Sequence, residues 1–161
     1  MVAALLAGTG IRISELLALA IGKHISADCS IISIRQQRGK WGGIESTPKT
    51  DADFRDIDLC PHLARILRSY IGDRESGFLF ETEGGKMLSK ENLWRDGFAT
   101  IVRKMGREGV RFHAFRRFRE AVLLSSECRE LLIDYWMGHS NTEMGSRYAK
   151  QLVKNRKFLA G

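Results

Sequence analysis

The sequence of 161 residues is poor in the residues that interrupt or cross-link a chain. It has two prolines and three cysteines, and the cysteines stand far apart as Cys29, Cys60 and Cys128. No Cys-x-x-Cys pair and no paired cysteine–histidine spacing occurs, which argues against a disulfide framework and against a zinc site. We therefore expect reduced thiols and predict neither a metal ion nor another cofactor.

Long hydrophobic runs are also missing. No apolar run reaches the roughly 20 residues that a membrane-spanning helix needs. The segment Val2–Ala7 is too short for a signal peptide and lacks a charged start. We expect a cytoplasmic protein without membrane contact. Because Val2–Ala7 looks like the end of a helix without its beginning, we also expect a chain truncated within its first helix.

Acidic residues become scarce toward the end of the chain. Residues 1–102 hold 13 basic and 13 acidic residues, whereas residues 103–161 hold 13 basic and 6 acidic residues. The net charge of +7 therefore comes from the last third. This asymmetry favours a surface that faces a polyanion such as nucleic acid, although a solvated basic face without a partner fits the composition too.

Hydrophobic periodicity predicts one α+β domain over residues 1–161, mostly helical, with a small antiparallel sheet of three strands near the N-terminal third. The sheet is expected within residues 24–59, where β-branched runs, glycine turns and alternation occur. Helical spacing predicts helices near residues 2–7, 13–20, 61–70, 89–105, 113–122 and 131–138. The fourth of these should bury an apolar stripe made of Trp94, Phe98, Ile101 and Met105.

The segment Arg111–Arg119 concentrates four arginines, three phenylalanines and one histidine. In a helix, His113 and Arg116 share one face, while Phe115 and Phe118 should face the core. Guanidinium groups bind phosphate oxygens well because they stay charged and can donate two parallel hydrogen bonds. This segment therefore predicts a phosphate-handling site.

Other patterns are weak when each is considered alone. Arg12 and Glu15 lie three residues apart at the start of a helix and fit an ordinary surface ion pair. Lys49 falls near the end of the middle strand or in the next turn, where a single lysine is usually solvated. A single Gly-His-Ser turn such as Gly138–Ser140 usually has only a structural role. A tyrosine near a C-terminus, such as Tyr148, usually packs against the protein.

Taken together and in order, these patterns resemble the catalytic domain of tyrosine recombinases, the phage integrase family. The order of the motifs matches, as do the spacings from the second motif to the third and on to the tyrosine, and the resemblance covers nearly the whole chain. Phe115 replaces the usual leucine and Arg117 the frequent histidine, which leaves the expected site residues unchanged. The matching motifs are Thr9–Leu16, His113–Arg117 and Met137–Ser140 followed by Tyr148.

The resemblance implies that a DNA strand is cleaved without metal or ATP, through a 3′-phosphotyrosyl intermediate, and is then rejoined. Tyr148 would be the nucleophile. Arg12 and Arg116 would hold the phosphate, and His139 would donate a hydrogen bond to its non-bridging oxygens.

Three further roles follow from the same resemblance. His113 would position the phosphate or assist proton transfer from Tyr148. Lys49, or Lys40 as the alternative, would protonate the leaving 5′ oxygen. Glu15 would orient an arginine or its loop rather than react.

The implied partner is double-stranded DNA, bound at the nucleoid by a tetramer of the full-length protein. The family's N-terminal DNA-clamping domain has no counterpart in these 161 residues. Other functions fit the sequence as well: a non-cleaving DNA-binding remnant of an integrase, a type IB topoisomerase, or a basic interaction module without a DNA role.

Overall fold

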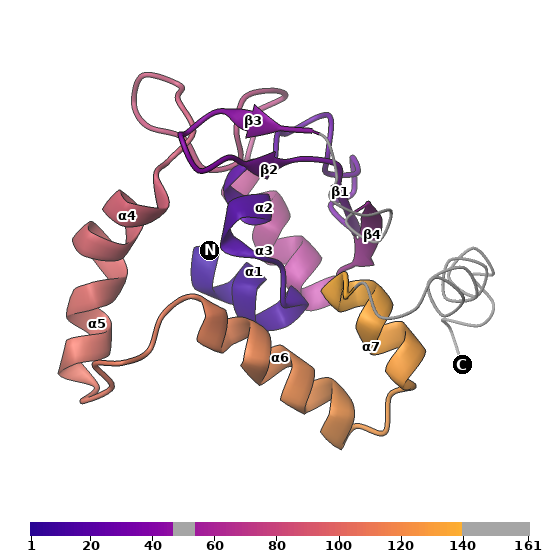
Figure 1. Ribbon diagram of the computed structural model, residues 1–161. Helices are drawn as coiled ribbons and strands as arrows, with labels where there is room; N and C mark the ends of the chain where they lie inside the picture. The colour runs from indigo at the N-terminus through magenta and orange to yellow at the C-terminus, as the bar shows by residue number, and fades with distance from the viewer. Residues whose placement is uncertain (47–53, 140–161) are drawn as a thin grey trace.

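The computed structural model describes residues 1–46 and 54–139, and its regular secondary structure is mostly helical (Figure 1). The helices are α1 (Val2–Thr9), α2 (Ile13–Leu17), α3 (Pro61–Ile71), α4 (Lys90–Leu93), the π-helix η2 (Trp94–Phe98), α5 (Ala99–Lys104), α6 (His113–Ser125) and α7 (Glu130–Met137). The strands are β1 (Ile31–Ile34), β2 (Gln37–Arg38), β3 (Ile44–Glu45) and β4 (Arg55–Asp58). The prediction of a mostly helical α+β domain is confirmed.

The strands pair differently from the prediction. β1 runs antiparallel to β4, with Ile34 opposite Arg55, and β2 runs antiparallel to β3. The described residues therefore contain two sheets of two strands rather than one sheet of three. The chain leaves the first sheet at Gln36, whose amide nitrogen donates a hydrogen bond to the carbonyl of Ala18 (2.7 Å). Beyond Gln36, β2 pairs with β3 and, among the described strands, with no other.

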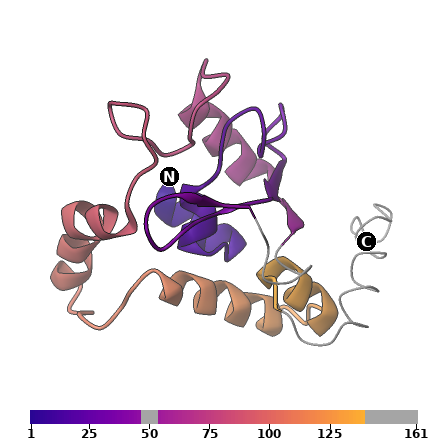
Figure 2. The same cartoon turned by 45° about the horizontal axis from the view of Figure 1, so that its top comes forward.

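The core surrounds α1 and α2. α1 packs against α6 and α3, and both views show it between α6 and the strands (Figures 1 and 2). Leu5, Leu16, Leu17 and Ile32 are fully buried there. α1 ends at Gly10, which adopts a positive φ of 69° and donates its N–H to the carbonyl of Leu6. This left-handed ending turns the chain toward α2.

Two predicted helix ends are confirmed. Pro61 is the first residue of α3, a position where the missing N–H of proline does no harm. Ser89 caps α4, since its hydroxyl accepts a hydrogen bond from the backbone N–H of Asn92 (3.0 Å).

The helix that follows Ser89 is interrupted by the π-helix η2. Trp94 and Phe98 pack edge-on against Phe112, with ring centroids 5.3 and 4.9 Å away. Ile101 and Met105, which were predicted to continue this stripe, are 56% and 68% exposed. A π-helical turn contains an extra residue, so it rotates all later side chains around the axis. This rotation moves Ile101 and Met105 off the buried face.

α6 buries only part of the face that was predicted: Phe115 packs against the core, as expected, with its ring centroid 6.0 Å from that of Phe98. Its inward residues include Arg116 and Leu123, and Phe112 is buried just before its start. Phe118, predicted to face the core, is 58% exposed. It lies two residues after Arg116, which is about 200° around the helix axis. Among the residues that the structure describes, no helix is long and apolar enough to cross a membrane.

Candidate functional site at the end of helix α7

Three arginines from distant parts of the chain converge on the C-terminal end of α7. Their guanidinium groups donate hydrogen bonds to three consecutive backbone carbonyls: Arg55 Nε to Trp136 (2.8 Å), Arg116 Nη2 to Met137, and Arg12 Nη2 to Gly138 (2.8 Å). The last carbonyls of a helix lack partners within the helix and form the negative end of its dipole. The end of α7 therefore attracts and orients three positive charges. We call Arg12, Arg55, Arg116 and Glu15 the arginine cluster.

The end of α7 is capped by a glycine and approached by Arg116 from α6. Gly138 adopts a left-handed conformation (φ 63°, ψ 46°) and caps the helix, as predicted from the sequence. Arg116 reaches the end of α7 from the buried face of α6, where it binds the carbonyl of Met137. Its Nη1 also donates a hydrogen bond to the carbonyl of Gly10 (3.0 Å), where α1 ends. One arginine thus joins the ends of two helices.

Glu15 lies between two of the arginines and is only 3% exposed. Its carboxylate accepts two hydrogen bonds from Arg55, Nη1 to Oε1 at 3.1 Å and Nη2 to Oε2 at 2.8 Å. Its Oε1 also accepts from Arg12 Nη1 (2.8 Å), and its Oε2 accepts from the backbone N–H of Arg12 (2.9 Å). The interpretation of Arg12 and Glu15 as an ordinary surface ion pair is therefore wrong.

The cluster stays charged at neutral pH. Burial by itself would raise the pKa of the Glu15 carboxyl, but the hydrogen bonds and charges of Arg55 and Arg12 outweigh burial and hold this pKa below its ordinary value. Burial lowers the pKa of the Arg116 guanidinium to about 10, and the nearby charges of Arg12 and Arg55 act in the same direction. Three positive charges therefore face one negative charge.

The arginines differ in how much surface they offer to a ligand. The side chain of Arg12 is 35% exposed, while that of Arg55 is 0% exposed. Arg116 is 5% exposed. Arg12 is thus the arginine of the cluster that presents the most surface, and the other two lie behind it.

His139 directly follows the last of the three carbonyls. Its Nδ1 lies 3.3 Å from Oδ1 of Asp134 and 3.9 Å from Oε1 of Glu120, and its backbone N–H donates to the carbonyl of Asp134 (2.9 Å). The ring is half-buried. The contact with Asp134 fixes the orientation of the ring relative to α7.

The other predicted site residues lie elsewhere or outside the description. His113 is exposed at the first residue of α6, three residues before Arg116. Lys40 lies in the turn between β2 and β3, with its ammonium 5.1 Å from the ring centroid of Trp41. Lys49 and Tyr148 lie outside the described residues. The structure thus brings Arg12, Glu15, Arg116 and His139 together.

Sequence reasoning missed Arg55. The signal was the alternation of β4, in which Arg55 shares a face with Ile57 and Leu59. These two residues are 3% and 8% exposed, and Arg55 is 2% exposed. An arginine in register with buried apolar residues needs a buried partner, and that partner is Glu15.

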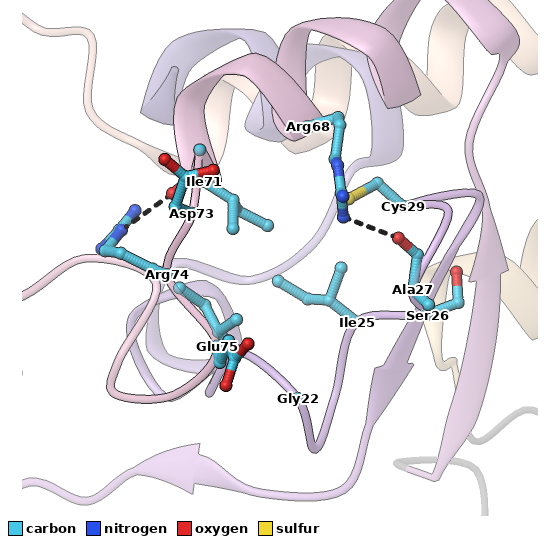
Figure 3. Close-up of a pocket in the computed structure, with 12 residues that line it drawn as sticks. Gly22, Ile25, Ser26, Ala27, Cys29, Arg68, Ile71, Asp73, Arg74 and Glu75 are labelled. Carbon is cyan, nitrogen blue, oxygen red and sulfur yellow. Dashed lines mark hydrogen bonds between the residues drawn. The ribbon is translucent and has the colours of Figure 1, made fainter.

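A separate pocket of about 490 Å³ lies between residues 21–29 and the end of α3 (Figure 3). Arg68 borders it and donates a hydrogen bond from Nη1 to the carbonyl of Ala27 (2.9 Å). The pocket shares no lining residue with the arginine cluster. Within residues 1–46 and 54–139, no group of three or more His, Cys, Asp or Glu side chains is arranged to hold a metal ion.

The family model described as the phage integrase family matches residues 1–155. The chain belongs to the phage integrase family. A XerC-like tyrosine recombinase of Caldanaerobacter subterraneus subsp. tengcongensis is 25% identical over 181 residues, which cover 95% of this chain and 45% of that protein. The integrase of Mycobacterium phage L5 is 28% identical over 159 residues, which cover 89% of this chain and 41% of that protein. The chain spans less than half the length of these relatives.

Two solved structures share the fold of this chain. The Tn1549 transposon integrase in complex with a circular intermediate DNA matches with a TM-score of 0.73 and 23% identity, over 96% of this chain and 57% of that one. The XerA recombinase matches with a TM-score of 0.66 and 20% identity, over 95% of this chain and 55% of that one. Both likenesses extend over nearly all of this chain.

Proposed function

We propose that this chain is the catalytic part of a site-specific DNA recombinase, which cleaves and rejoins strands through a 3′-phosphotyrosyl intermediate without a metal ion. The observation that carries the proposal is the convergence of Arg12, Arg116 and His139 on the end of α7, in a member of the phage integrase family. The Tn1549 integrase, which has this fold, is bound to DNA. This supports duplex DNA as the partner.

The cluster suits a phosphodiester because it holds positive charge in a fixed arrangement. Arg12 is fastened by Glu15 and by the carbonyl of Gly138, yet keeps a third of its side chain exposed. Charge that develops on the phosphoryl oxygens is stabilised best by donors that need no reorganisation. In the proposed mechanism Arg12 contacts the phosphate directly, and Arg116 adds its charge from behind. His139 donates to a non-bridging oxygen.

The cleavage step forms one bond and breaks another. The Tyr148 oxygen attacks phosphorus in line, the bond from phosphorus to the 5′ oxygen breaks, and the 3′ phosphate becomes attached to the tyrosine. His113 accepts the phenol proton or positions the phosphate. Lys49, with Lys40 as the alternative, donates a proton to the leaving 5′ oxygen. Rejoining reverses these steps with a second 5′-hydroxyl, so the bond energy is conserved.

The charge distribution supports the choice of partner. The last 59 residues carry the whole net charge of +7, and α6 and α7 belong to this region. Binding that neutralises phosphates should weaken steeply as salt rises. The full-length protein is proposed to assemble as a tetramer on two duplexes.

A trapping assay tests the chemistry. Duplexes are selected from a random-sequence library by binding, then nicked next to the cleaved phosphate so that the released short strand diffuses away. We expect a denaturant-resistant protein–DNA adduct from the wild type and none from Tyr148→Phe. Tyr70→Phe, which alters a tyrosine 43% exposed on α3, serves as the control and should keep the adduct.

The other outcomes each identify a different function. Salt-sensitive binding without an adduct would identify a non-cleaving DNA-binding remnant. Relaxation of supercoiled plasmids that lack the selected site would identify a type IB topoisomerase. Absent or salt-insensitive binding would identify a basic interaction module.

A further inference from the structure

Arg55 has the surroundings of an organising residue rather than of a ligand contact. It is the first residue of β4, and its side chain is 0% exposed. It belongs to none of the sequence motifs on which the family resemblance rests. A side chain without exposed surface cannot touch a phosphate in this arrangement, so its contacts within the protein must explain its presence.

Those contacts join two helices. On one side, two guanidinium nitrogens of Arg55 bind both carboxylate oxygens of Glu15 in α2. On the other side, its Nε donates to the carbonyl of Trp136 in the last turn of α7 (2.8 Å). The planar guanidinium group fixes the directions of these bonds. The end of α7 is therefore tied to α2 through one side chain of β4.

A second contact ties the same strand to the same turn. The backbone N–H of Asp56 donates to the hydroxyl of Tyr135 (3.2 Å), and α7 lies beside β4 (Figure 1). β4 thus holds Tyr135 and Trp136, the two residues before Met137 and Gly138. The carbonyls of Met137 and Gly138 receive Arg116 and Arg12.

Arg55 also balances the charge of the carboxylate that Arg12 uses. Glu15 is bound by Arg12 and Arg55 together, so the cluster holds three positive charges against one negative charge. Without Arg55, the same carboxylate would stand against two arginines instead of three. The field that a phosphate meets would be less positive.

We propose that Arg55 is a positioning residue, which holds the end of α7 against α2 so that the Met137 and Gly138 carbonyls set the places of Arg116 and Arg12. The expected effect of Arg55 on the cleavage rate rests on the proposed function. Its expected effect on the position of the α7 end does not, because that can be measured without DNA.

The variants separate this role from simple charge balance. Arg55→Met removes the tie and leaves Glu15 buried with less compensation, so its thermal stability should fall. Glu15→Gln/Arg55→Met removes the charge and its counter-charge together, and should recover most of that stability. Glu15→Gln alone keeps the hydrogen bond from Arg55 to the carbonyl of Trp136.

Amide hydrogen exchange at the end of α7 distinguishes the two roles, because a residue that only balances the charge of Glu15 would not change it. The N–H groups of Gly138 and His139 donate to Tyr135 and Asp134. Exchange is compared with that of the slowest core amides in the same protein, which report global unfolding. Relative to them, we expect both amides in the double variant to exchange at least about tenfold faster than in the wild type. In Glu15→Gln alone, this relative exchange should stay close to that of the wild type. Arg68→Met, which removes a guanidinium bound to the carbonyl of Ala27 beside the separate pocket (Figure 3), is the matched control and should not change it.

Two results would overturn the inference. Wild-type exchange in the double variant would show that Arg55 is only the counter-ion of Glu15. Equally fast exchange in Glu15→Gln alone would show that Glu15 rather than Arg55 holds the α7 end.

Adduct formation with the nicked duplex tests the catalytic part. The single-turnover rate of the double variant should be at least about tenfold lower than that of Glu15→Gln alone, with the dissociation constant for the duplex changed by less than about threefold. An unchanged rate would contradict a positioning role in the reaction. Failure of the wild type to form any adduct would contradict the proposed function instead, while the exchange data would still decide the role of Arg55.

Discussion

Arg12 and Arg116 donate hydrogen bonds to neighbouring carbonyls, those of Gly138 and Met137, although the two arginines lie far apart in the sequence. The spacing of these carbonyls is set by the last turn of α7. A rigid helix end therefore fixes how far apart the two guanidinium groups lie. A phosphate site built in this way is preorganised before DNA arrives.

Arg12 should be the arginine most sensitive to substitution. Arg12→Ala removes a partly exposed guanidinium, and we expect the single-turnover cleavage rate to fall by about 10²- to 10³-fold. Arg12→Lys should recover little, because an ammonium cannot bind Glu15 and the Gly138 carbonyl with one planar group. Rates are measured by adduct formation on the nicked duplex. Arg95→Ala, at an exposed pair with Asp96, is the control and should cleave normally. A wild-type rate in Arg12→Lys would contradict the need for a planar guanidinium group that binds Glu15 and the Gly138 carbonyl together.

Gly10→Ala should lower the free energy of unfolding by more than the strain of a positive φ alone would. A Cβ at this position would lie 2.5 Å from Cε and 2.9 Å from Sδ of Met137, so the end of this fully buried side chain would have to shift. We expect a loss of about 3 kcal/mol in the free energy of unfolding, from backbone strain and overpacking together. Gly85→Ala has a similar φ of +71° with nothing within 4 Å, so about 1 kcal/mol is expected there. Equal losses in chemical denaturation would contradict the clash.

Local signals in the sequence were enough to predict three helix ends, although the helix predicted over residues 13–20 ends already at Leu17. Pro61, Ser89 and Gly138 act through their own backbone or through neighbours a few residues away. The pairing of strands was not predictable in this way, because alternation shows that a segment is a strand but not which strand lies beside it. The two sheets separate at Gln36, whose side chain donates a hydrogen bond to the carbonyl of Ala18, 18 residues earlier.

The candidate site shows the same difference between local and long-range signals. The motifs pointed to Arg12, Glu15, Arg116 and His139, and the structure brings these residues together. Arg55 was missed because its partners, Glu15 and Trp136, lie 40 and 81 residues away in the sequence. The exposure of Phe118 was missed for a related reason, since the face of α6 that looked polar contains Arg116, whose burial depends on carbonyls of other helices.

Two phenylalanines near the start of α6 should therefore differ in their effect on stability. Phe112 is 7% exposed and contacts the rings of Trp94 and Phe98. Phe112→Ala should lower the free energy of unfolding by about 3–5 kcal/mol. Phe118→Ala should change it by less than about 0.5 kcal/mol, because Phe118 is 58% exposed. Urea denaturation measures both, and similar losses would contradict the assigned face of α6.

Glu15 should make stability depend on acid pH in a predictable direction. The pKa of Glu15 in the folded protein lies below its ordinary value of about 4.5, since Arg55 and Arg12 outweigh burial. For a carboxyl whose pKa is lowered by folding, the stabilisation is fully present above the unfolded-state pKa. It is lost as pH falls through the folded-state pKa.

The comparison with Glu15→Gln isolates this contribution. At pH 7 the variant should be less stable than the wild type by about 3 kcal/mol, because Arg55 stays buried without its counter-ion. Below about pH 4.5 the gap should narrow as the wild-type carboxyl takes up its proton and comes to resemble the amide. Urea denaturation between pH 3 and pH 7 measures it, with Glu45→Gln, an exposed carboxylate of β3, as the control. A gap that stays constant over this range would mean that the Glu15 charge does not stabilise the cluster.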